Sequence, residues 1–541
     1  MKEFRSTKVI DPACGSGIFL RTILEFQCAP NFDPVSSDDI RASFDNVVGI
    51  DIDENATQAS RLSLALLHMV LMSGELPGKL NIYSKSAFDH FESENTSNQY
   101  GLFISNPPYI ASDVQSTETR KKIQDILGDL AKGKSDSYLP FLKFSIDVLQ
   151  PGGYGMLVLP HSFLKLSSAS KIREYIAANS WIRCLVDLSE VPVFENYGSY
   201  VILLIFQKKF TEIVQRDAPL ATVVICKDFV GHALIDYLKG LRVQKNFYQI
   251  FDLDQKTFQE KEWNLSSPQE RRILGKLNTF EPLGNFLGIF QGIVTGNDSV
   301  FVINQKDVPT SEKAIWKPLL TDREMLRYKV PKTVEKSVLY PILNGTKLSI
   351  NQLKSDFPAT WKYLEKHKEK LQKGNSKNSS WWMPHRLRDP KELFRVKLIT
   401  PHLVLLPKFG LDDTGRYVVS HAPFLTANDR ISERELLKFF LGILNSDVGA
   451  WLIASHSDKY SKGYARLEVG TLGKIPVPNP ARISSSDLKN IIDLVDKQIK
   501  SKIDLEVEKE INKLVAKLYD VSANELNEIG LLSTHANDSI G

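Results

Sequence analysis

The first 210 residues alternate between two hydrophobic patterns. Short apolar runs that end in turn residues predict β-strands, and longer stretches with apolar residues at helical spacing separate them. This alternation predicts an α/β domain with a mostly parallel sheet and helices on its faces. The predicted strands are Lys8–Asp11, Val47–Asp51, Leu80–Tyr83, Leu102–Ser105, Gly155–Pro160, Cys184–Asp187 and Tyr200–Phe206, and the predicted helices include Ile18–Phe26, Glu54–Met72 and Ser170–Ala178.

The pattern changes after residue 210. Residues 211–280 show no sustained period and are interpreted as a linker or connecting region. From Leu283 onward, frequent glycines interrupt short apolar runs, which predicts an α+β domain over residues 281–480. Residues 481–541 then carry apolar positions at helical spacing between Ser484 and Ile529, which predicts a helical tail with a packing role.

Composition limits the class of protein. The chain has 541 residues, of which 42% are hydrophobic and 24% charged, as in ordinary globular proteins of two or three domains. Its four cysteines form no C-x-x-C pair, so the sequence predicts neither a zinc site nor a disulfide framework, and a reducing cytoplasm fits. The longest apolar run, Tyr200–Phe206, is too short to span a bilayer, so no membrane role is expected.

The net charge of +4 hides a strongly basic segment. Trp316–Lys408 contains 15 Lys and 5 Arg against 8 acidic residues, a net charge of +12, which leaves −8 for the rest of the chain. Aromatic residues are interleaved with these charges, a pattern typical of nucleic-acid surfaces. A solvated lysine-rich helix is the alternative for Lys362–Lys373. The residues expected to contact DNA are Trp382, Arg386, Arg388 and Lys397, with phosphate contacts favoured over base contacts for the two arginines.

The most informative stretch is Asn106-Pro107-Pro108-Tyr109, which directly follows a predicted strand. Two prolines stiffen the loop and leave carbonyl oxygens free to accept hydrogen bonds. The Asn106 oxygen and the Pro107 carbonyl could accept the two N–H groups of a planar amine, while Tyr109 stacks on its face. We interpret these four residues as a catalytic loop, the alternative being a proline turn that ends a strand.

Two earlier turns indicate a nucleoside cofactor. The stretch Asp11-Pro12-Ala-Cys-Gly15-Ser-Gly17 lies between a strand and a helix, where glycines allow close approach of a ligand to the backbone. The strand Val47–Asp51 ends in an acid, an arrangement that holds a ribose through its hydroxyls. Parallel strands bind ligands beyond their carboxyl ends, so the three turns are expected to meet there.

These motifs, in this order, resemble the adenine-specific DNA methyltransferases of restriction-modification systems, with the TaqI-type arrangement of a Rossmann-like catalytic domain followed by a target-recognition domain. The resemblance implies S-adenosylmethionine as cofactor, double-stranded DNA as substrate, and methyl transfer to a flipped adenine. It also implies that Asp11, Pro12, Gly15 and Gly17 contact the cofactor, Asp51 its ribose and Ile52 its adenine. By the same resemblance Asn106, Pro107, Pro108 and Tyr109 hold the target base.

The sequence departs from the family pattern at three places. The family has an acid after the third strand, where Ser86 stands, and Asp89 is the expected substitute for this cofactor contact. A second stacking aromatic is expected near Leu166–Lys171, where Ala169 stands; Phe163 is a replacement that is more often a core residue. Only ten residues precede Asp11, so amino-terminal elements are expected to be missing or supplied by a restriction or amino-terminal subunit.

Two alternatives remain open at this stage. A protein glutamine or small-molecule methyltransferase could share the loop and the cofactor fold, although the basic segment argues against it. A truncated or split DNA-binding subunit that is not active alone is the other alternative.

Overall fold

The computed structural model describes residues 2–29, 34–93, 96–191, 200–210, 218–226, 248–374, 380–429, 432–459 and 464–529. The chain divides into two compact units, residues 1–268 and 269–541. Each unit has its own buried apolar clusters.

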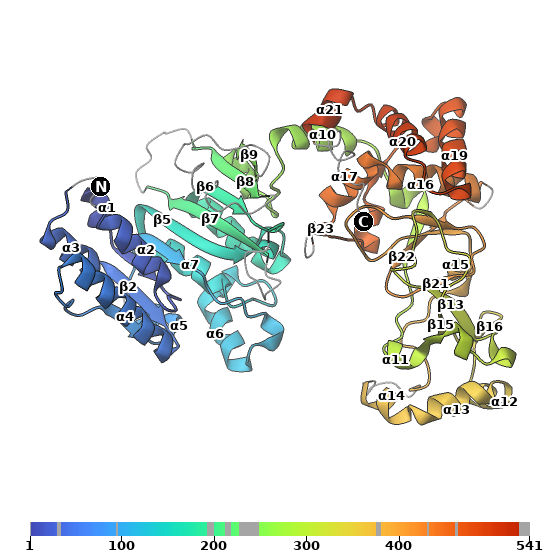
Figure 1. Ribbon diagram of the computed structural model, residues 1–541, viewed down its shortest axis with the longest axis horizontal. Coiled ribbons are helices and arrows are strands. Elements are labelled where there is room, and N and C mark those ends of the chain that lie inside the picture. Colours follow the sequence, from blue (N-terminus) through green and yellow to red (C-terminus); the bar gives the residue numbers. More distant parts are fainter. Residues whose placement is uncertain are drawn as a thin grey trace. The chain divides into compact units, whose positions relative to one another are not determined.

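The first unit is built on a nine-stranded mixed sheet in the order β3-β2-β1-β4-β5-β7-β6-β8-β9. All of its strands run parallel except β7 and β9, which confirms the predicted α/β class (Figure 1). The strands are β1 (Val9–Asp11), β2 (Val47–Asp51), β3 (Asn81–Ser84), β4 (Tyr100–Ser105), β5 (Leu149–Pro160), β6 (Ser180–Asp187), β7 (Val201–Lys208), β8 (Ala221–Cys226) and β9 (Tyr248–Leu253).

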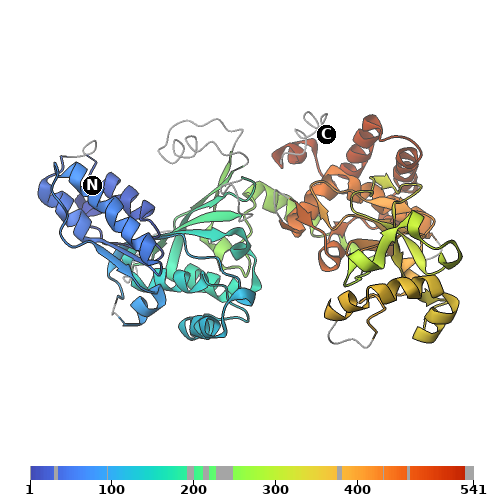
Figure 2. The same cartoon turned by 60° about the horizontal axis from the view of Figure 1, so that its bottom comes forward.

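Helices cover both faces of this sheet (Figures 1 and 2). One face buries apolar residues of α2, α3 and α4 against β1 to β4. The other face buries α6, α7 and α8 against the strands from β4 onward. The helices of the unit are α1 (Lys2–Arg5), α2 (Ile18–Gln27), α3 (Ser37–Asp45), α4 (Glu54–Leu71), α5 (Ala87–Ser93), α6 (Thr117–Leu127), α7 (Leu139–Val148) and α8 (Ser170–Asn179).

The short strand β1 explains the position of the site. All three of its residues are buried, and it lies between β2 and β4, with Val9 level with Val47 and Leu102. Because the order of connections reverses between β1 and β4, the carboxyl edge here forms the crevice where such sheets bind ligands. The turns after β1, β2 and β4 all lie at this edge.

The connecting region expected at residues 211–280 is partly structured. Its described residues add β8 and β9 to the first sheet and supply α10 (Pro268–Leu277), whose Ile273 and Leu277 are buried in the core of the second unit. β8 is covered on both faces, since the adjacent Val223 and Val224 are both fully buried, so its apolar run lacks the alternation that marks a half-exposed strand.

The second unit combines several small sheets with helices. Its largest sheet has the order β11-β22-β18-β20-β14, and a second has the order β12-β15-β13-β21. These strands are β11 (Leu287–Gln291), β12 (Val302–Asn304), β13 (Trp316–Leu320), β14 (Tyr328–Lys329), β15 (Lys336–Leu339), β18 (Lys397–Ile399), β20 (Gly410–Asp412), β21 (Val418–Val419) and β22 (Pro423–Ala427). The remaining strands pair as β10 (Glu281–Pro282) with β25 (Pro476–Val477), β16 (Ile342–Leu343) with β17 (Thr346–Lys347), and β24 (Ala465–Arg466) with both β19 (Leu403–Val404) and β23 (Asp458–Lys459).

The helical tail joins the core of this unit. Ile491 and Val495 of α19 pack where Gly442 of α16 leaves no side chain in the way. The helices of the unit, besides α10, are α11 (Asp298–Phe301), α12 (Ile350–Asp356), α13 (Pro358–Lys366), α14 (Lys368–Gly374), α15 (Pro390–Leu393), α16 (Glu433–Asn445), α17 (Asp447–His456), α18 (Val469–Gly473), α19 (Ser485–Lys500), α20 (Leu505–Leu518) and α21 (Ala523–Glu528). Within the described residues no single helix has the length and apolar character to cross a membrane, although α16 and α17, bent by 75°, meet both criteria as a pair.

Candidate active site

The Gly15–Gly17 turn is fastened to the end of β2. The Gly15 N–H donates to Asp51 Oδ2 at 2.9 Å, and the Cys14 N–H donates to the Ile50 carbonyl at 2.9 Å. Gly17 has φ +82° and begins α2, and a Cβ placed on it would lie 2.3 Å from Ser60 Oγ of α4. Glycine is therefore required at Gly17 for the close approach of two helices.

Gly15 differs from Gly17 in what surrounds it. Its φ is +53°, but no heavy atom lies within 4 Å of the position that a Cβ would occupy. The turn thus presents bare backbone to an open space at the edge of the sheet. This is the room that a cofactor needs if it is to lie against the strand end and the start of α2.

The two acids of the edge have different surroundings. Asp11 is 1% exposed, beside the buried Pro12, and its Oδ1 accepts the Ala13 N–H at 3.1 Å. Burial, aided by the nearby Asp51 carboxylate, raises the pKa of Asp11 to about 7 despite that hydrogen bond. Asp51 is half-buried, and its other oxygen accepts the Asp53 N–H at 3.0 Å.

Ile52 follows Asp51 and is 80% exposed, which is unusual for isoleucine at a strand end. An exposed apolar side chain next to a carboxylate fits a nucleoside, since the acid can bind ribose hydroxyls while the apolar side chain meets the flat face of a base. The residues present therefore fit the predicted cofactor.

Ser86 and Asp89, the other two predicted cofactor residues, make local interactions. Ser86 Oγ accepts the Phe88 N–H at 3.2 Å at the start of α5, where it acts as a helix cap. Asp89 is exposed and forms an ion pair with Lys122 of α6. That ion pair satisfies the Asp89 carboxylate without any ligand, and the sequence could not foresee it because the two residues are far apart in the chain.

The Asn106–Tyr109 loop is held rigidly at the end of β4. The Ser137 hydroxyl donates to the Pro108 carbonyl and accepts the Ile110 N–H at 2.8 Å, so one side chain fixes both sides of the loop. Pro107 is buried, whereas Asn106 and Pro108 are exposed. The loop therefore offers the Asn106 side chain to the crevice from a fixed backbone.

Asn106 and Tyr109 also contact each other. The Tyr109 hydroxyl donates to Asn106 Oδ1 at 2.7 Å, and burial raises the pKa of Tyr109 well above its usual value, so the hydroxyl keeps its proton. This bond places the amide oxygen, rather than the amide nitrogen, toward the ring. A carbonyl oxygen accepts two hydrogen bonds, so one lone pair remains for a substrate amine.

The predicted second aromatic does not reach the crevice. Ala169 and Phe163 are both fully buried, and the Phe163 ring lies edge-on to Trp263 at 5.5 Å and to Tyr138 at 6.3 Å. Phe163 is therefore a core residue, as the alternative interpretation had it.

A pair that the sequence did not reveal lies at the same edge. His161 directly follows β5 and its Nε2 lies 3.5 Å from Asp187 Oδ2, at the end of β6. The sequence does contain an indication of this pair, because His161 directly follows one predicted strand and Asp187 ends another strand of the same sheet. Within the described residues no group of three or more His, Cys, Asp or Glu side chains is arranged to hold a metal ion.

Two of the four predicted DNA contacts are wrong. Lys397 is fully buried, and its Nζ lies 3.0 Å from the equally buried Asp412 Oδ2. Trp382 is 6% exposed and belongs to an apolar cluster with Leu364 and Leu371. Neither side chain is accessible to DNA, because Lys397 pairs with Asp412 and Trp382 packs in an apolar cluster, both inside the second unit.

The two predicted arginines lie nearer to the surface. Arg386 is exposed, and its backbone pairs with Val294 in both directions. Arg388 is half-buried, and its Nε donates to the Gly292 carbonyl at 2.9 Å. Burial and the neighbouring Arg386 lower the pKa of Arg388, which still leaves it charged at neutral pH.

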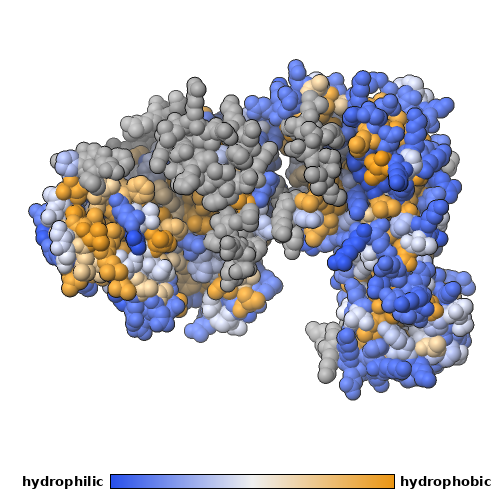
Figure 3. All heavy atoms as spheres, in the orientation of Figure 1, coloured by the Kyte–Doolittle hydropathy of each residue, from blue (hydrophilic) through white to orange (hydrophobic). Residues whose placement is uncertain are grey.

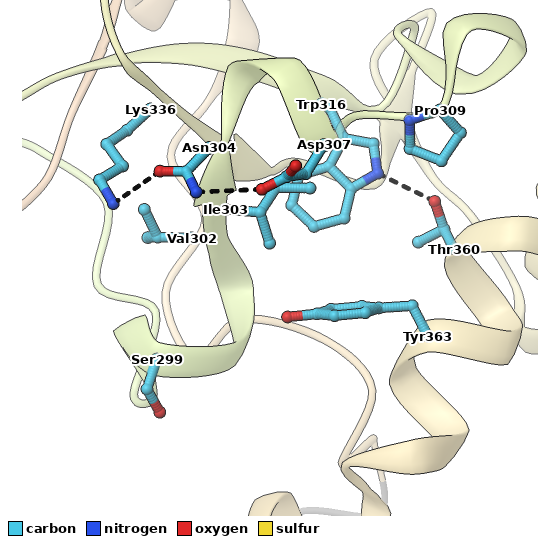
Figure 4. Close-up of a pocket in the computed structure, with 10 residues that line it drawn as sticks. All are labelled: Ser299, Val302, Ile303, Asn304, Asp307, Pro309, Trp316, Lys336, Thr360 and Tyr363. Carbon is cyan, nitrogen blue, oxygen red and sulfur yellow. Dashed lines mark hydrogen bonds between the residues drawn. The ribbon is translucent and has the colours of Figure 1, made fainter.

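The second unit also contains a pocket of about 450 Å³ (Figure 4). Its polar groups are bonded to one another: Lys336 Nζ to Asn304 Oδ1 at 3.1 Å, Asn304 Nδ2 to Asp307 Oδ2 at 3.0 Å, and Trp316 Nε1 to Thr360 Oγ1 at 2.9 Å. The pocket therefore has a defined shape without a ligand. It contains none of the predicted site residues.

Comparison with known proteins identifies both units. Residues 45–194, which include the Asn106 loop, match the Eco57I restriction-modification methylase family, and residues 340–477 match the TaqI-like C-terminal specificity domain. Residues 45–194 and 340–477 are thus similar to the methylase domain and the specificity domain of restriction-modification proteins. This confirms the resemblance inferred from the sequence motifs.

Individual relatives are similar to this chain along nearly its whole length. Type II methyltransferase M.BstVI of Geobacillus stearothermophilus is 24% identical over 98% of this chain and 93% of the relative. Type II methyltransferase M.BanIII of Aneurinibacillus aneurinilyticus is 22% identical over 95% of this chain and 91% of the relative. The solved structure of the Type IIL restriction-modification enzyme MmeI in complex with DNA shares the fold, with a TM-score of 0.66 and 12% identity, over 98% of this chain and 73% of that one.

Proposed function

We propose that the chain transfers a methyl group from S-adenosylmethionine to the exocyclic amino group of an adenine flipped out of double-stranded DNA, as part of a restriction-modification or related phage-defence system. The observation that carries the proposal is the Asn106 oxygen, oriented by Tyr109 on a loop fixed beside the Gly15–Asp51 turn. The family match and the names of the relatives support DNA as the substrate.

Bound S-adenosylmethionine supplies an electrophilic methyl group. Asp51 would bind its ribose hydroxyls, Ile52 would contact its adenine, and the open space beside Gly15 would admit the rest of the molecule. Asp11 lies beneath the turn and holds its shape through the Ala13 N–H. The cofactor residues therefore position a reactant and do not themselves exchange protons with the substrate.

The catalytic loop activates the amine by accepting hydrogen bonds from its two N–H groups. An exocyclic amino group is a poor nucleophile while its lone pair is delocalised into the ring. Hydrogen bonds from its two N–H groups to Asn106 Oδ1 and the Pro107 carbonyl favour the pyramidal form, in which the lone pair is directed at the methyl group. The hydroxyl of Tyr109 holds Asn106 in the orientation that this requires.

The second unit supplies binding energy that the loop lacks. Flipping a base out of a duplex costs a few kcal/mol, and stacking on one ring such as Tyr109 returns roughly 1–3 kcal/mol. DNA contacts elsewhere must provide the remainder. We propose that Arg386 and Arg388, within the basic segment 316–408, contact phosphates.

The test is a methylation assay with labelled S-adenosylmethionine, followed by mass spectrometry of the nucleosides. Wild-type chain is expected to yield N6-methyladenine, and Asn106→Ala is expected to yield none. The control is Asn490→Ala, an exposed asparagine of α19 in the other unit. Methylated cytosine as the product, or methylated protein glutamine without methylated DNA, would overturn the proposal.

A restriction or amino-terminal subunit that completes the enzyme remains part of this proposal. Calorimetry of the purified chain with S-adenosylmethionine tests it separately. A chain that binds cofactor and methylates DNA alone needs no further subunit. A chain that binds no cofactor until proteins from neighbouring genes are added is one part of a split enzyme.

A further inference from the structure

Helix α4 carries apolar residues on its outer face as well as on its inner one. The side that it turns to the sheet buries Thr57, Ser60, Leu64 and His68, and Leu67 and Leu71 pack partly buried against the same cluster. The opposite side carries Leu62, Leu66 and Val70, spaced four residues apart, which are 62%, 54% and 79% exposed. The outer face of a surface helix is ordinarily polar, so an apolar outer row indicates a face that a partner covers.

Helix α2 adds a second exposed apolar row on the same side of the unit. Ile18 and Phe26, eight residues apart and therefore on one face of the helix, are 63% and 52% exposed. Both helices pack on the same buried cluster, through Leu20 of α2 and Leu64 of α4, so their outer faces share one surface. Figure 3 shows apolar side chains gathered over this side of the first unit.

We call the outer faces of α2 and α4 the α2/α4 patch, defined by Ile18, Phe26, Leu62, Leu66 and Val70. With side-chain surfaces of roughly 150–200 Å² each, the exposed fractions amount to on the order of 500 Å² of apolar area. That is at the upper end of the largest patches on ordinary monomers. With a polar rim, it approaches the roughly 800 Å² that each partner contributes to a standard interface.

Charge around the α2/α4 patch is balanced. From Asn55 to Leu71 the chain has one Lys, Arg, Asp or Glu residue, Arg61, and its guanidinium donates to the Ile82 carbonyl at 2.6 Å in the neighbouring strand. On α2, Arg21 and Glu25 form an exposed ion pair at 2.8 Å. Arg61 is turned to the sheet, so the exposed charges of the two outer faces are the Arg21–Glu25 pair, which does not repel an identical surface.

We propose that the α2/α4 patch is the docking surface for a second copy of this chain, with α4 packed against α4 of the partner across a two-fold axis. A two-fold contact requires a surface that is complementary to itself. Side-chain rows at four-residue spacing interdigitate with identical rows when two such helices cross.

Sedimentation of the full-length chain tests the proposal. At micromolar concentration the wild-type chain is expected to have twice the mass of one chain, and Leu66→Gln is expected to raise the dissociation constant by at least roughly tenfold. Leu505→Gln is the matched control, because Leu505 is a 67% exposed leucine of α20. A wild-type chain that stays monomeric overturns the proposal, as does a dimer that Leu66→Gln leaves intact.

A cross-linking variant identifies the contact itself. Under mild oxidation Leu66→Cys is expected to form a disulfide-linked dimer, because a residue near a two-fold axis meets its own copy. Leu505→Cys and the wild-type chain are expected to stay uncross-linked, because Cys14, Cys28 and Cys226 are buried and Cys184 is half-buried within β6. If Leu66→Cys is not cross-linked where the wild-type chain sediments as a dimer, the proposed α4–α4 contact is wrong.

Discussion

The two glycines of the cofactor turn are expected to respond differently to alanine. Gly17→Ala places a non-glycine residue at φ +82°, which costs roughly 1–2 kcal/mol, and puts a Cβ 2.3 Å from Ser60 Oγ. Relieving such an overlap in a packed interior costs roughly 1–3 kcal/mol more. We therefore expect Gly17→Ala to lower the free energy of unfolding of the first unit by about 2–5 kcal/mol.

Gly15→Ala meets no overlap, since no atom lies within 4 Å of the new Cβ. Its backbone strain of about 1–2 kcal/mol is offset in part by roughly 0.4–1 kcal/mol of lost freedom in the unfolded chain. The new methyl group instead projects into the space assigned to the cofactor. We expect nearly unchanged stability and at least a roughly tenfold loss of affinity for S-adenosylmethionine, equal to about 1.4 kcal/mol.

Hydrogen exchange of β1 and β2 amides measures the stability of the first unit separately from the second. The double variant Gly17→Ala/Ser60→Ala removes the overlapping oxygen and should recover about 1–2 kcal/mol, which a double-mutant cycle isolates. Calorimetry with S-adenosylmethionine gives the affinities. Equal destabilisation by the two alanines, or no recovery with Ser60→Ala, would refute the packing argument.

Four further predictions concern the catalytic loop, two buried charged groups and the DNA-binding surface. Asn106→Ala should abolish methyl transfer while cofactor and DNA binding, measured by calorimetry and filter binding, stay within about twofold; retained turnover would remove the loop from the mechanism. Because the fold raises the pKa of Asp11 from 3.8 to about 7, native chain holds a proton that unfolded chain has lost, so stability should fall as pH rises from about 4 to 7. In urea melts, Asp11→Asn should flatten this dependence. In urea melts, Lys397→Met should lower the unfolding free energy by about 3–5 kcal/mol, since it leaves the buried Asp412 carboxylate without its cation and with only the hydrogen bonds from Thr414, Gly415 and Tyr417. Arg386→Ala should weaken DNA binding and flatten its salt dependence without changing stability.

The parts of the fold that the sequence predicts well are those where local pattern and sheet order agree. β2 is predicted at Val47–Asp51 and observed there, and α4 is predicted one residue too long. Apolar runs that end in glycine or an acid mark carboxyl ends of parallel strands, so the hydrophobic pattern alone predicts that Asp11, Asp51 and Asn106 share one edge. Their meeting follows from β1 lying between β2 and β4.

The two wrong DNA contacts share a different cause. The basic residues around Lys397 and Trp382 predict a DNA surface, but the burial of each side chain depends on partners that are distant in sequence. Asp412, fifteen residues away, makes Lys397 an internal cation. Composition describes a segment, whereas accessibility belongs to single side chains, and only tertiary structure separates an exposed arginine from a buried lysine.

Asp11 and Ile52 mark the cofactor edge more specifically than the glycines do. Burying a carboxyl group and exposing an isoleucine both cost free energy in the free protein. Here the two residues lie at the carboxyl ends of neighbouring strands, since Asp11 ends β1 and Ile52 directly follows β2. A ligand that combines an apolar ring with a positive charge reduces both costs, because the ring covers Ile52 and the charge favours the ionised form of Asp11. S-adenosylmethionine has both features, so the unfavourable burial pattern of the free edge is itself an argument for that cofactor.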